Sequence, residues 1–180
     1  MRIFIALDIP AEIRARLTEY MERARALAPE ARWARVEGLH VTLKFVGQVS
    51  DATVEQIKTA LASIKTAPFT VRFEGIGFFP NPKAARVFWA GVDGGNELPR
   101  LALAIDAAWE KLGVECETKP YHPHLTLART SARSLRELQP LLADTPPQFG
   151  TMTAREFFLY QSQPQKGGSR YTKLERFRLE

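Results

Sequence analysis

The chain has 180 residues, enough to bury a real core as one domain or as two tightly joined lobes. Its 45% hydrophobic and 25% charged residues are ordinary for a globular protein, and no run approaches the ~18 apolar residues of a membrane-spanning helix. The formal net charge of +5 at pH 7 is consistent with an anionic partner, but simple solubility explains it equally well.

The single cysteine and the first residues of the chain favour a cytoplasmic protein. Cys116 has no partner for an internal disulfide and stands in no nucleophile motif, so we expect it to be structural. The apolar start of the chain is too short for a signal peptide, and Asp8 interrupts it.

In the first half of the chain, apolar periodicity predicts strands that alternate with helices. Pro10 ends the first strand, Pro29 ends the first helix and Gly47 ends the second long strand, while Ser50 or Asp51 caps the next helix. The predicted order is a strand (3–9), a helix (13–27), a short strand or loop (32–36), a strand (40–46), a helix (54–64) and a hairpin (69–79 and 85–92).

The second half repeats this order of elements. Gly113 occupies a helix C-cap position, Ser131 or Ser134 caps a fourth helix, and Pro146-Pro147 breaks that helix. Because both halves read strand, helix, strand, helix, strand, we infer a weak internal duplication with two lobes. The predicted elements are a helix (98–112), a strand from residue 124, a helix (135–142) and two strands (151–161 and 171–179) around a polar loop (163–169).

Two copies of the tetrapeptide His-x-Thr-Leu, at 40–43 and 124–127, dominate the sequence. They lie 124 − 40 = 84 residues apart and contain two of the three histidines. Because side chains alternate along a strand, His40 and Thr42 share one face and their aliphatic neighbours share the other. The same alternation places His124 beside Thr126.

Two such strands facing each other would surround one small anion with two imidazoles and two hydroxyls. One neutral histidine takes a proton from a nucleophile, and the other, protonated, gives a proton to a leaving oxygen. An ordinary histidine pKa near ~6.5 makes both forms available near neutral pH. This arrangement suits in-line attack at phosphorus and requires neither a metal nor another cofactor.

Two other interpretations stay open on the residues alone. His40 and His124 would be hydrogen-bonded sheet residues in a purely structural interpretation. Metal binding would recruit His122 as well, although no carboxylate or thiol motif accompanies the histidines and Pro123 favours a loop.

A few further side chains are candidates for the site. Lys44 has the same parity as His40, so it is expected to face the same way and hold a phosphate, or else to be a solvated strand-end lysine. Arg129 has the opposite parity and reaches the site only if the strand ends or bulges near Ala128. Four aromatic side chains are candidates for stacking on a base, or for simple packing: Phe4, Phe45, Tyr121 and Tyr171.

Segments along nearly the whole chain carry a family resemblance. The most specific is residues 119–129, Lys-Pro-Tyr-His-Pro-His-Leu-Thr-Leu-Ala-Arg. The other segments are 2–6 with Pro10, Trp33, 40–47, 78–80, 86–92, 158–162, Gly168 and Tyr171. In these segments the sequence resembles the 2H phosphoesterases, specifically the bacterial RNA 2′,3′-cyclic phosphodiesterases, also called 2′-5′ RNA ligases.

The resemblance implies an α+β fold in which residues 1–180 form one bilobal domain. Its two pseudo-symmetric lobes would each hold an antiparallel sheet flanked by helices, with the active-site cleft between the sheets. It also implies hydrolysis of an RNA 2′,3′-cyclic phosphate, or of a cyclic nucleotide, to a 2′-phosphate. The reverse reaction, 2′-5′ ligation, would use the same groups.

The resemblance also implies a role for each site residue. His40 is the proton donor and His124 the proton acceptor, while Thr42, Thr126 and Arg129 hold phosphate oxygens. Lys119 and Tyr121 stand where the family often has Arg and Phe, a change that bears on base preference more than on chemistry.

We therefore expect a metal-independent phosphodiesterase that acts on RNA ends as a cytoplasmic monomer. The alternative is a non-catalytic module that binds RNA ends or nucleotides in the same cleft. The intact His and Thr of both motifs favour the enzyme.

Overall fold

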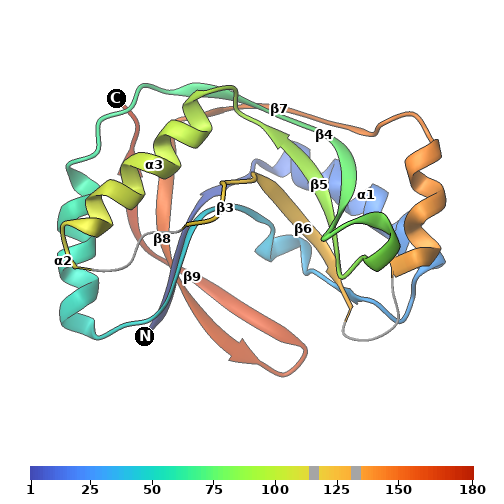
Figure 1. The fold of residues 1–180 in the computed structure, drawn as a ribbon, viewed down its shortest axis with the longest axis horizontal. Coiled ribbons are helices and arrows are strands. Elements are labelled where there is room, and N and C mark those ends of the chain that lie inside the picture. The colour runs from blue at the N-terminus through green and yellow to red at the C-terminus, as the bar shows by residue number, and fades with distance from the viewer. Residues whose placement is uncertain (114–117, 131–134) are drawn as a thin grey trace.

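The structure, a computed structural model, describes residues 1–113, 118–130 and 135–180. Two antiparallel sheets form its framework (Figure 1). The first contains, in spatial order, β3 (His40–Gln48), β1 (Arg2–Asp8), β8 (Glu156–Gln165) and β9 (Gly168–Arg178). The second contains β2 (Arg32–Trp33), β6 (His124–Arg129), β5 (Val87–Asp93), β4 (Phe69–Phe79) and β7 (Gln148–Ala154).

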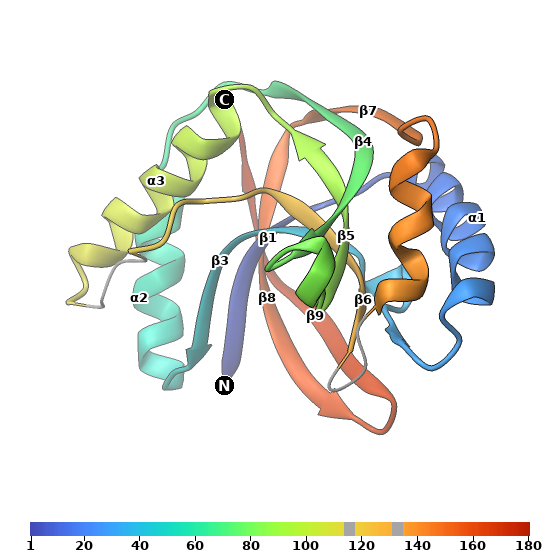
Figure 2. The same ribbon diagram turned by 45° about the vertical axis from the view of Figure 1, so that its right-hand side comes forward.

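Helices flank the sheets on two sides, as Figure 2 shows. α2 (Asp51–Ala62) and α3 (Glu97–Glu110) lie together on one side, and α1 (Ala11–Leu27) lies on the other with the 3₁₀ helix η3 (Leu135–Ala143). Two short 3₁₀ helices, η1 (Val36–Gly38) and η2 (Pro82–Ala84), precede β3 and β5. This arrangement confirms the predicted α+β class. In the described part of the chain, no helix is long and apolar enough to cross a bilayer.

The two sheets are built on the same plan. In each, a strand leads into a helix, and the motif strand returns antiparallel beside the first strand: β1–α1–β3 in one and β5–α3–β6 in the other. Two more strands extend each sheet beyond the leading strand, β8–β9 beside β1 and β4–β7 beside β5. The predicted pseudo-symmetry of the lobes is therefore present, with the two motif strands in equivalent positions.

The lobes do not follow the halves of the chain, contrary to the expectation from element order. β8 and β9 come last in the sequence but belong to the sheet of β1 and β3. The predicted single strand at 151–161 is in fact two strands in different sheets, β7 and β8, separated by Arg155. The crossing falls at the charged pair Arg155-Glu156, which contains neither a proline nor a glycine, so the prediction ran one strand through it.

Three smaller predictions also need correction. β3 continues to Gln48, because Gly47 adopts a φ of 88° and still pairs with Ile3. The polar loop predicted at 163–169 is mostly strand, since β8 and β9 pair as far as Gln165 and Gly168. The predicted fourth helix is a 3₁₀ helix that contains Pro140, a residue that cannot donate the α-helical hydrogen bond. Ser131, Ser134 and Cys116 lie outside the described residues.

One hydrophobic core runs through both sheets and the helices that flank them. Ile3, Ile5 and Leu7 of β1 contribute to it from one face of the first sheet. A separate small cluster, Phe4, Ala6, Phe158 and Tyr160, covers the opposite face of the same sheet. The first sheet therefore has apolar side chains on both faces, and only one of those faces is closed by helices.

A buried ion pair ties the first sheet to a helix of the second. Lys44 of β3 pairs through Nζ with Oδ1 of Asp106 on α3, and its side chain is 6% exposed. The same ammonium lies 5.9 Å from the centre of the Trp109 ring, also on α3. Because α3 connects β5 to β6, this pair joins the two lobes at the level of the motif strands.

We expect Asp106→Ala to lower the free energy of unfolding by about 3 kcal/mol, because it leaves the Lys44 ammonium buried without its carboxylate. Chemical denaturation monitored by circular dichroism measures this loss. Glu55→Ala, which removes the exposed pair with Lys58, is the control and should leave the midpoint unchanged. An equal shift in both variants would show that Lys44–Asp106 acts as an ordinary surface pair.

Candidate active site

A β-bulge at the leucine of each motif determines which side chains share a face. Across β1 and β3, Ala6 pairs with Thr42 and Ile5 with Lys44, so Leu43 is the extra residue. Across β5 and β6, Trp89 pairs with Thr126 and Phe88 with Ala128, so Leu127 is the extra residue. The bulges occupy equivalent positions, and each inverts the parity of the strand beyond the motif.

The surface that these strands share, called the histidine face here, holds both histidines and both threonines. His40, Thr42, His124 and Thr126 are partly exposed there, as the alternation predicts. The aliphatic members of the motifs are turned into the core, with Val41 and Leu125 fully buried. The motif strands also touch across the lobes, where the Tyr121 hydroxyl donates to the carbonyl oxygen of Thr42 at 3.0 Å.

The bulges bring different residues to the histidine face at equivalent positions. Beyond the first motif this residue is Phe45, which pairs with Phe4 and is 67% exposed. Beyond the second motif it is Arg129, which is exposed and pairs with Val87. The condition set for Arg129 by the sequence, a bulge near Ala128, is therefore met.

Lys44 lies on the core face of the sheet, opposite the histidine face, so the expectation that it lines the site is wrong. It pairs with Ile5, a core residue, and its ammonium is held by Asp106. Strand parity predicted the opposite orientation because the bulge at Leu43 interrupts the alternation between Thr42 and Lys44.

Both imidazoles are oriented by the same hydrogen bond. Nδ1 of His40 donates to the carbonyl oxygen of Gly38 at 2.6 Å, and Nδ1 of His124 donates to that of His122 at 2.7 Å. Since a carbonyl oxygen only accepts, each Nδ1 carries the proton. Nε2 of each ring is therefore left to accept or donate a proton on the histidine face.

The surroundings lower the pKa of both histidines below the ordinary value near 6.5. For His40 burial is the largest cause, with Arg14 and His124 adding to it, while the Gly38 carbonyl and Asp8 oppose it. For His124 burial again dominates, with His122 and Arg129 adding to it and the His122 carbonyl opposing. Both rings thus favour the neutral form in the free protein, and the charge of His124 acts on His40 across the face.

The threonine hydroxyls are available to a ligand. Within residues 1–113, 118–130 and 135–180, the hydroxyl of neither Thr42 nor Thr126 has a hydrogen-bond partner. The guanidinium of Arg129 likewise forms no ion pair with any described carboxylate. Two donors and one cation therefore accompany the two Nε2 atoms, a set that matches the oxygens of a phosphate.

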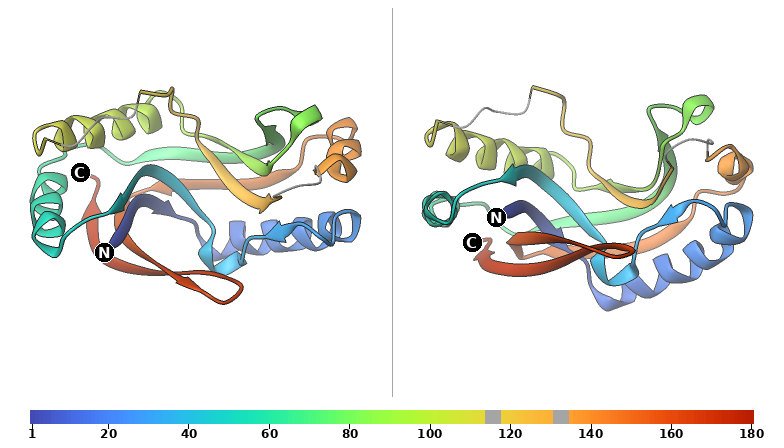
Figure 3. Two further views of the ribbon diagram at one scale, coloured as in Figure 1. Left: turned by 60° about the horizontal axis from the view of Figure 1, so that its bottom comes forward. Right: turned by 90° about the horizontal axis from the view of Figure 1, so that it is seen from below.

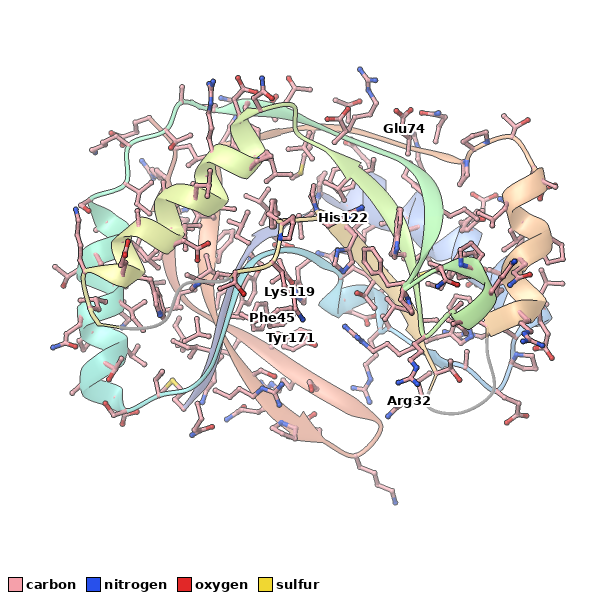
Figure 4. The ribbon with its side chains drawn as sticks, viewed as in Figure 1. Arg32, Phe45, Glu74, Lys119, His122 and Tyr171 are labelled. Atoms are coloured by element: carbon pink, nitrogen blue, oxygen red, sulfur yellow. The ribbon has the colours of Figure 1, made fainter. Side chains whose placement is uncertain are left out.

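Aromatic rings surround His40. The ring of Phe4 lies 4.6 Å from the imidazole between centroids, and Tyr171 meets it edge-on at 5.2 Å. Phe4 in turn stacks on Tyr160 at 5.0 Å, with an angle of 5° between the rings. In Figure 4, Phe45 and Tyr171 are drawn beside Lys119 in the space between β3 and β9. This side of the site offers flat apolar surfaces of the kind that stack on a nucleobase.

His124 has different neighbours. Phe79 meets both its ring and the ring of His122 edge-on at 5.0 Å. Trp89, which pairs with Thr126, lies 5.4 Å from His122 and covers Gly77, where a β-carbon would lie 2.1 Å from the indole. His122 is therefore an exposed loop residue packed on aromatic rings.

Two charged residues that sequence reasoning missed hold His40 in place. Asp8 is the cross-strand partner of His40, and its Oδ1 accepts from Nη2 of Arg14 at 2.7 Å. Arg14 also donates to the carbonyls of Ile9, Val36 and Leu39, so it closes the turn from which His40 emerges. The partner of His124 at the position of Asp8 is Gly91. The spacing of Asp8, Arg14 and His40 in the sequence carried no signal, because these residues meet only in the folded chain, where β1 pairs with β3.

The described residues give little support to the metal interpretation. No group of three or more His, Cys, Asp or Glu side chains converges in the part of the chain that the structure describes. An open pocket of about 760 Å³ lies away from the histidine face. It is lined by residues 65–70, the Gly94-Gly95 turn and the start of α3, and none of the motif residues borders it.

Comparison with known proteins identifies relatives over the whole length of the chain. The family model of LigT-like phosphoesterases matches residues 7–89. The RNA 2′,3′-cyclic phosphodiesterase of Archaeoglobus fulgidus is 33% identical over 90% of this chain and 91% of that protein. The protein of the same name from Thermus thermophilus is 36% identical over 99% of this chain and 90% of that protein.

Solved structures agree with these sequence relatives. The crystal structure of TT0787 from Thermus thermophilus superposes with a TM-score of 0.83 at 30% identity, covering 99% of this chain and 98% of that one. Escherichia coli LigT complexed with 3′-AMP superposes with a TM-score of 0.81, also at 30% identity, covering 99% and 97%.

We expect the imidazole resonances of His40 and His124 in the free protein to titrate with midpoints below 6.5, because burial disfavours the imidazolium form. Proton NMR over a pH series measures the midpoints, and spectra of His40→Gln and His124→Gln assign them. A midpoint above 6.5 for either ring would contradict the desolvated environment described above.

Proposed function

This chain belongs to the LigT-like phosphoesterase family, and we propose that it is an enzyme that hydrolyses the 2′,3′-cyclic phosphate end of an RNA to a 2′-phosphate. The observation that carries the proposal is the pair of opposed imidazoles, each with Nδ1 bound to a carbonyl and Nε2 free. Such a pair can take a proton on one side of a phosphorus atom and give a proton on the other.

In this mechanism the phosphate lies between the two motif strands. The hydroxyls of Thr42 and Thr126 donate to its non-bridging oxygens, and Arg129 adds a charge-assisted contact. Support comes from the absence of competing partners for these three side chains within the described residues. Lys44 takes no part, because its ammonium is committed to Asp106.

The two histidines transfer protons in opposite directions. Nε2 of neutral His124 takes a proton from water, and the water oxygen attacks phosphorus. The bond from phosphorus to the 3′-oxygen breaks on the far side, and Nε2 of protonated His40 gives its proton to that oxygen. The product carries a 2′-phosphate and a free 3′-hydroxyl, and solvent then restores both rings. If the 5′-hydroxyl of a second RNA took the place of water, the same proton transfers would join the two RNA ends through a 2′-5′ linkage and release the 3′-hydroxyl.

The asymmetry of the site supports this assignment of roles. The leaving group is a nucleoside, and the flat apolar surfaces of Phe45 and Tyr171 lie on the side of His40. Burial, Arg14 and His124 lower the pKa of His40, and the carboxylate of Asp8 opposes them, so Asp8 is the charged group that favours the protonated form of a donor. On the other side, His122 and Arg129 both lower the pKa of His124 and favour the neutral form that an acceptor requires.

We place the enzyme in the cytoplasm as a monomer, with RNA ends or cyclic nucleotides as its ligands. These statements stay predictions from the sequence, and the single cysteine and the positive charge are consistent with them.

We expect His40→Ala and His124→Ala each to reduce kcat for a nucleoside 2′,3′-cyclic monophosphate by about 10²–10⁴-fold, the usual contribution of a positioned acid or base. The assay contains EDTA, so that retained wild-type activity demonstrates that no metal is needed. His122→Ala is the matched control and should keep most of the activity. Full activity in His40→Ala or in His124→Ala would contradict the mechanism. Tight product binding without turnover by the wild type would indicate a non-catalytic binding module.

We expect Asp8→Asn to move the basic limb of the kcat/KM profile to lower pH, because it removes a carboxylate that raises the pKa of His40. A donor must be protonated, so its pKa sets the pH above which activity falls. The asparagine oxygen still accepts from Arg14, which preserves the turn before His40. Movement of the acidic limb alone would instead make His40 the acceptor.

A further inference from the structure

Arg32 lies on the histidine face beside the proposed site. Its cross-strand partner is Arg129, and directly paired residues share one face of a sheet. Two like charges opposite each other on a sheet are destabilising unless an anion lies near both. Figure 4 places Arg32 away from Phe45 and Tyr171, toward the tip of the β8–β9 hairpin.

Arg35 stands at the same end of the face, against the hairpin. A β-carbon on Gly167, in the hairpin turn, would lie 3.4 Å from Nη2 of Arg35. Both views of Figure 3 show the tip of the hairpin beside the segment that leads into β3. Gly167 has a φ of 83°, so this turn needs a glycine for its backbone and thereby leaves room for the guanidinium.

Both arginines are cations near one end of the histidine face. In the described part of the chain, neither Arg32 nor Arg35 forms an ion pair, although Glu30 and Glu37 are close in sequence. Some cations elsewhere on the surface are paired, for example Lys58 with Glu55 and Arg176 with Glu156. Two guanidinium groups without a carboxylate partner among the described residues therefore stand where the histidine face opens toward the hairpin.

The same segment connects these charges to the proposed nucleoside side of the site. After Arg35 comes Gly38, where a β-carbon would lie 3.1 Å from the ring of Tyr171, and two residues later comes His40. Five residues span at most roughly 18 Å, so Arg35 lies within a few nucleotides of the cyclic phosphate. A strand that leaves the nucleoside on Tyr171 toward the hairpin tip would pass this arginine.

We propose that Arg32 and Arg35 hold backbone phosphates of the RNA upstream of its terminal nucleotide, so that the preferred substrate is an oligonucleotide and not a cyclic mononucleotide. This inference rests on the proposed function. Contacts of this kind add affinity and position without reading sequence, and their strength falls as salt rises.

The test compares a ten-nucleotide RNA that ends in a 2′,3′-cyclic phosphate with the matching cyclic mononucleotide. In the double variant Arg32→Ala/Arg35→Ala, kcat/KM for the oligonucleotide should fall about tenfold at low salt, while that for the mononucleotide stays within about twofold. Binding of the 2′-phosphorylated product RNA, measured by fluorescence anisotropy, should lose about 1.4 from the slope of log K against log salt, the value for two phosphates of a single strand.

Two variants serve as controls. Arg170→Ala removes a cation from the same hairpin, but strand alternation turns this residue away from the face that Tyr171 occupies, so both substrates should be unaffected. Arg32→Lys/Arg35→Lys keeps the charges and should keep most of the salt slope.

Equal losses on both substrates would mean that the arginines bind the terminal phosphate, and would overturn the proposal. No loss on the oligonucleotide, or an equal loss in Arg170→Ala, would overturn it as well. Failure of the wild type to open the cyclic phosphate of either substrate would instead refute the proposed function, which keeps the two conclusions separate.

Discussion

The paired bulges at Leu43 and Leu127 are the constraint on which the site depends. Each strand must bury two consecutive residues after its threonine, Leu43 with Lys44 and Leu127 with Ala128. The extra residue satisfies the core and at the same time turns the next side chain onto the histidine face. Without the bulges, Phe45 and Arg129 would point into the interior, where neither an aromatic stacking surface nor a phosphate contact is of use.

A second constraint acts on the imidazoles themselves. In both lobes the carbonyl two residues before the histidine accepts from Nδ1, so the backbone selects the tautomer. On the side of His40 this carbonyl belongs to a turn that Arg14 closes through several backbone oxygens. Aromatic rings pack against both histidines, but the one that we propose as the donor also follows a turn held by the charged pair of Arg14 and Asp8.

The two lobes share a plan and differ in its chemistry. Opposite the histidine, the first lobe has Asp8 and the second has Gly91. Beyond the bulge, the first lobe has Phe45 and the second has Arg129. A symmetric pair of histidines would not distinguish the attacking water from the leaving nucleoside. These differences provide a direction, with an apolar nucleoside side at His40 and a cationic side at His124.

The sequence by itself determined most element positions and the grouping of His40, Thr42, His124 and Thr126, because strand alternation is a local property of the chain. The α+β class was implied by the family resemblance of its motifs. The sequence also stated the condition under which Arg129 would join the motif residues. The placement of Lys44, the roles of Asp8 and Arg14, and the pairing of Arg32 with Arg129 were decided only by the tertiary structure. Each depends on the register between strands far apart in sequence, and a one-residue bulge that inverts this register leaves no trace in apolar periodicity.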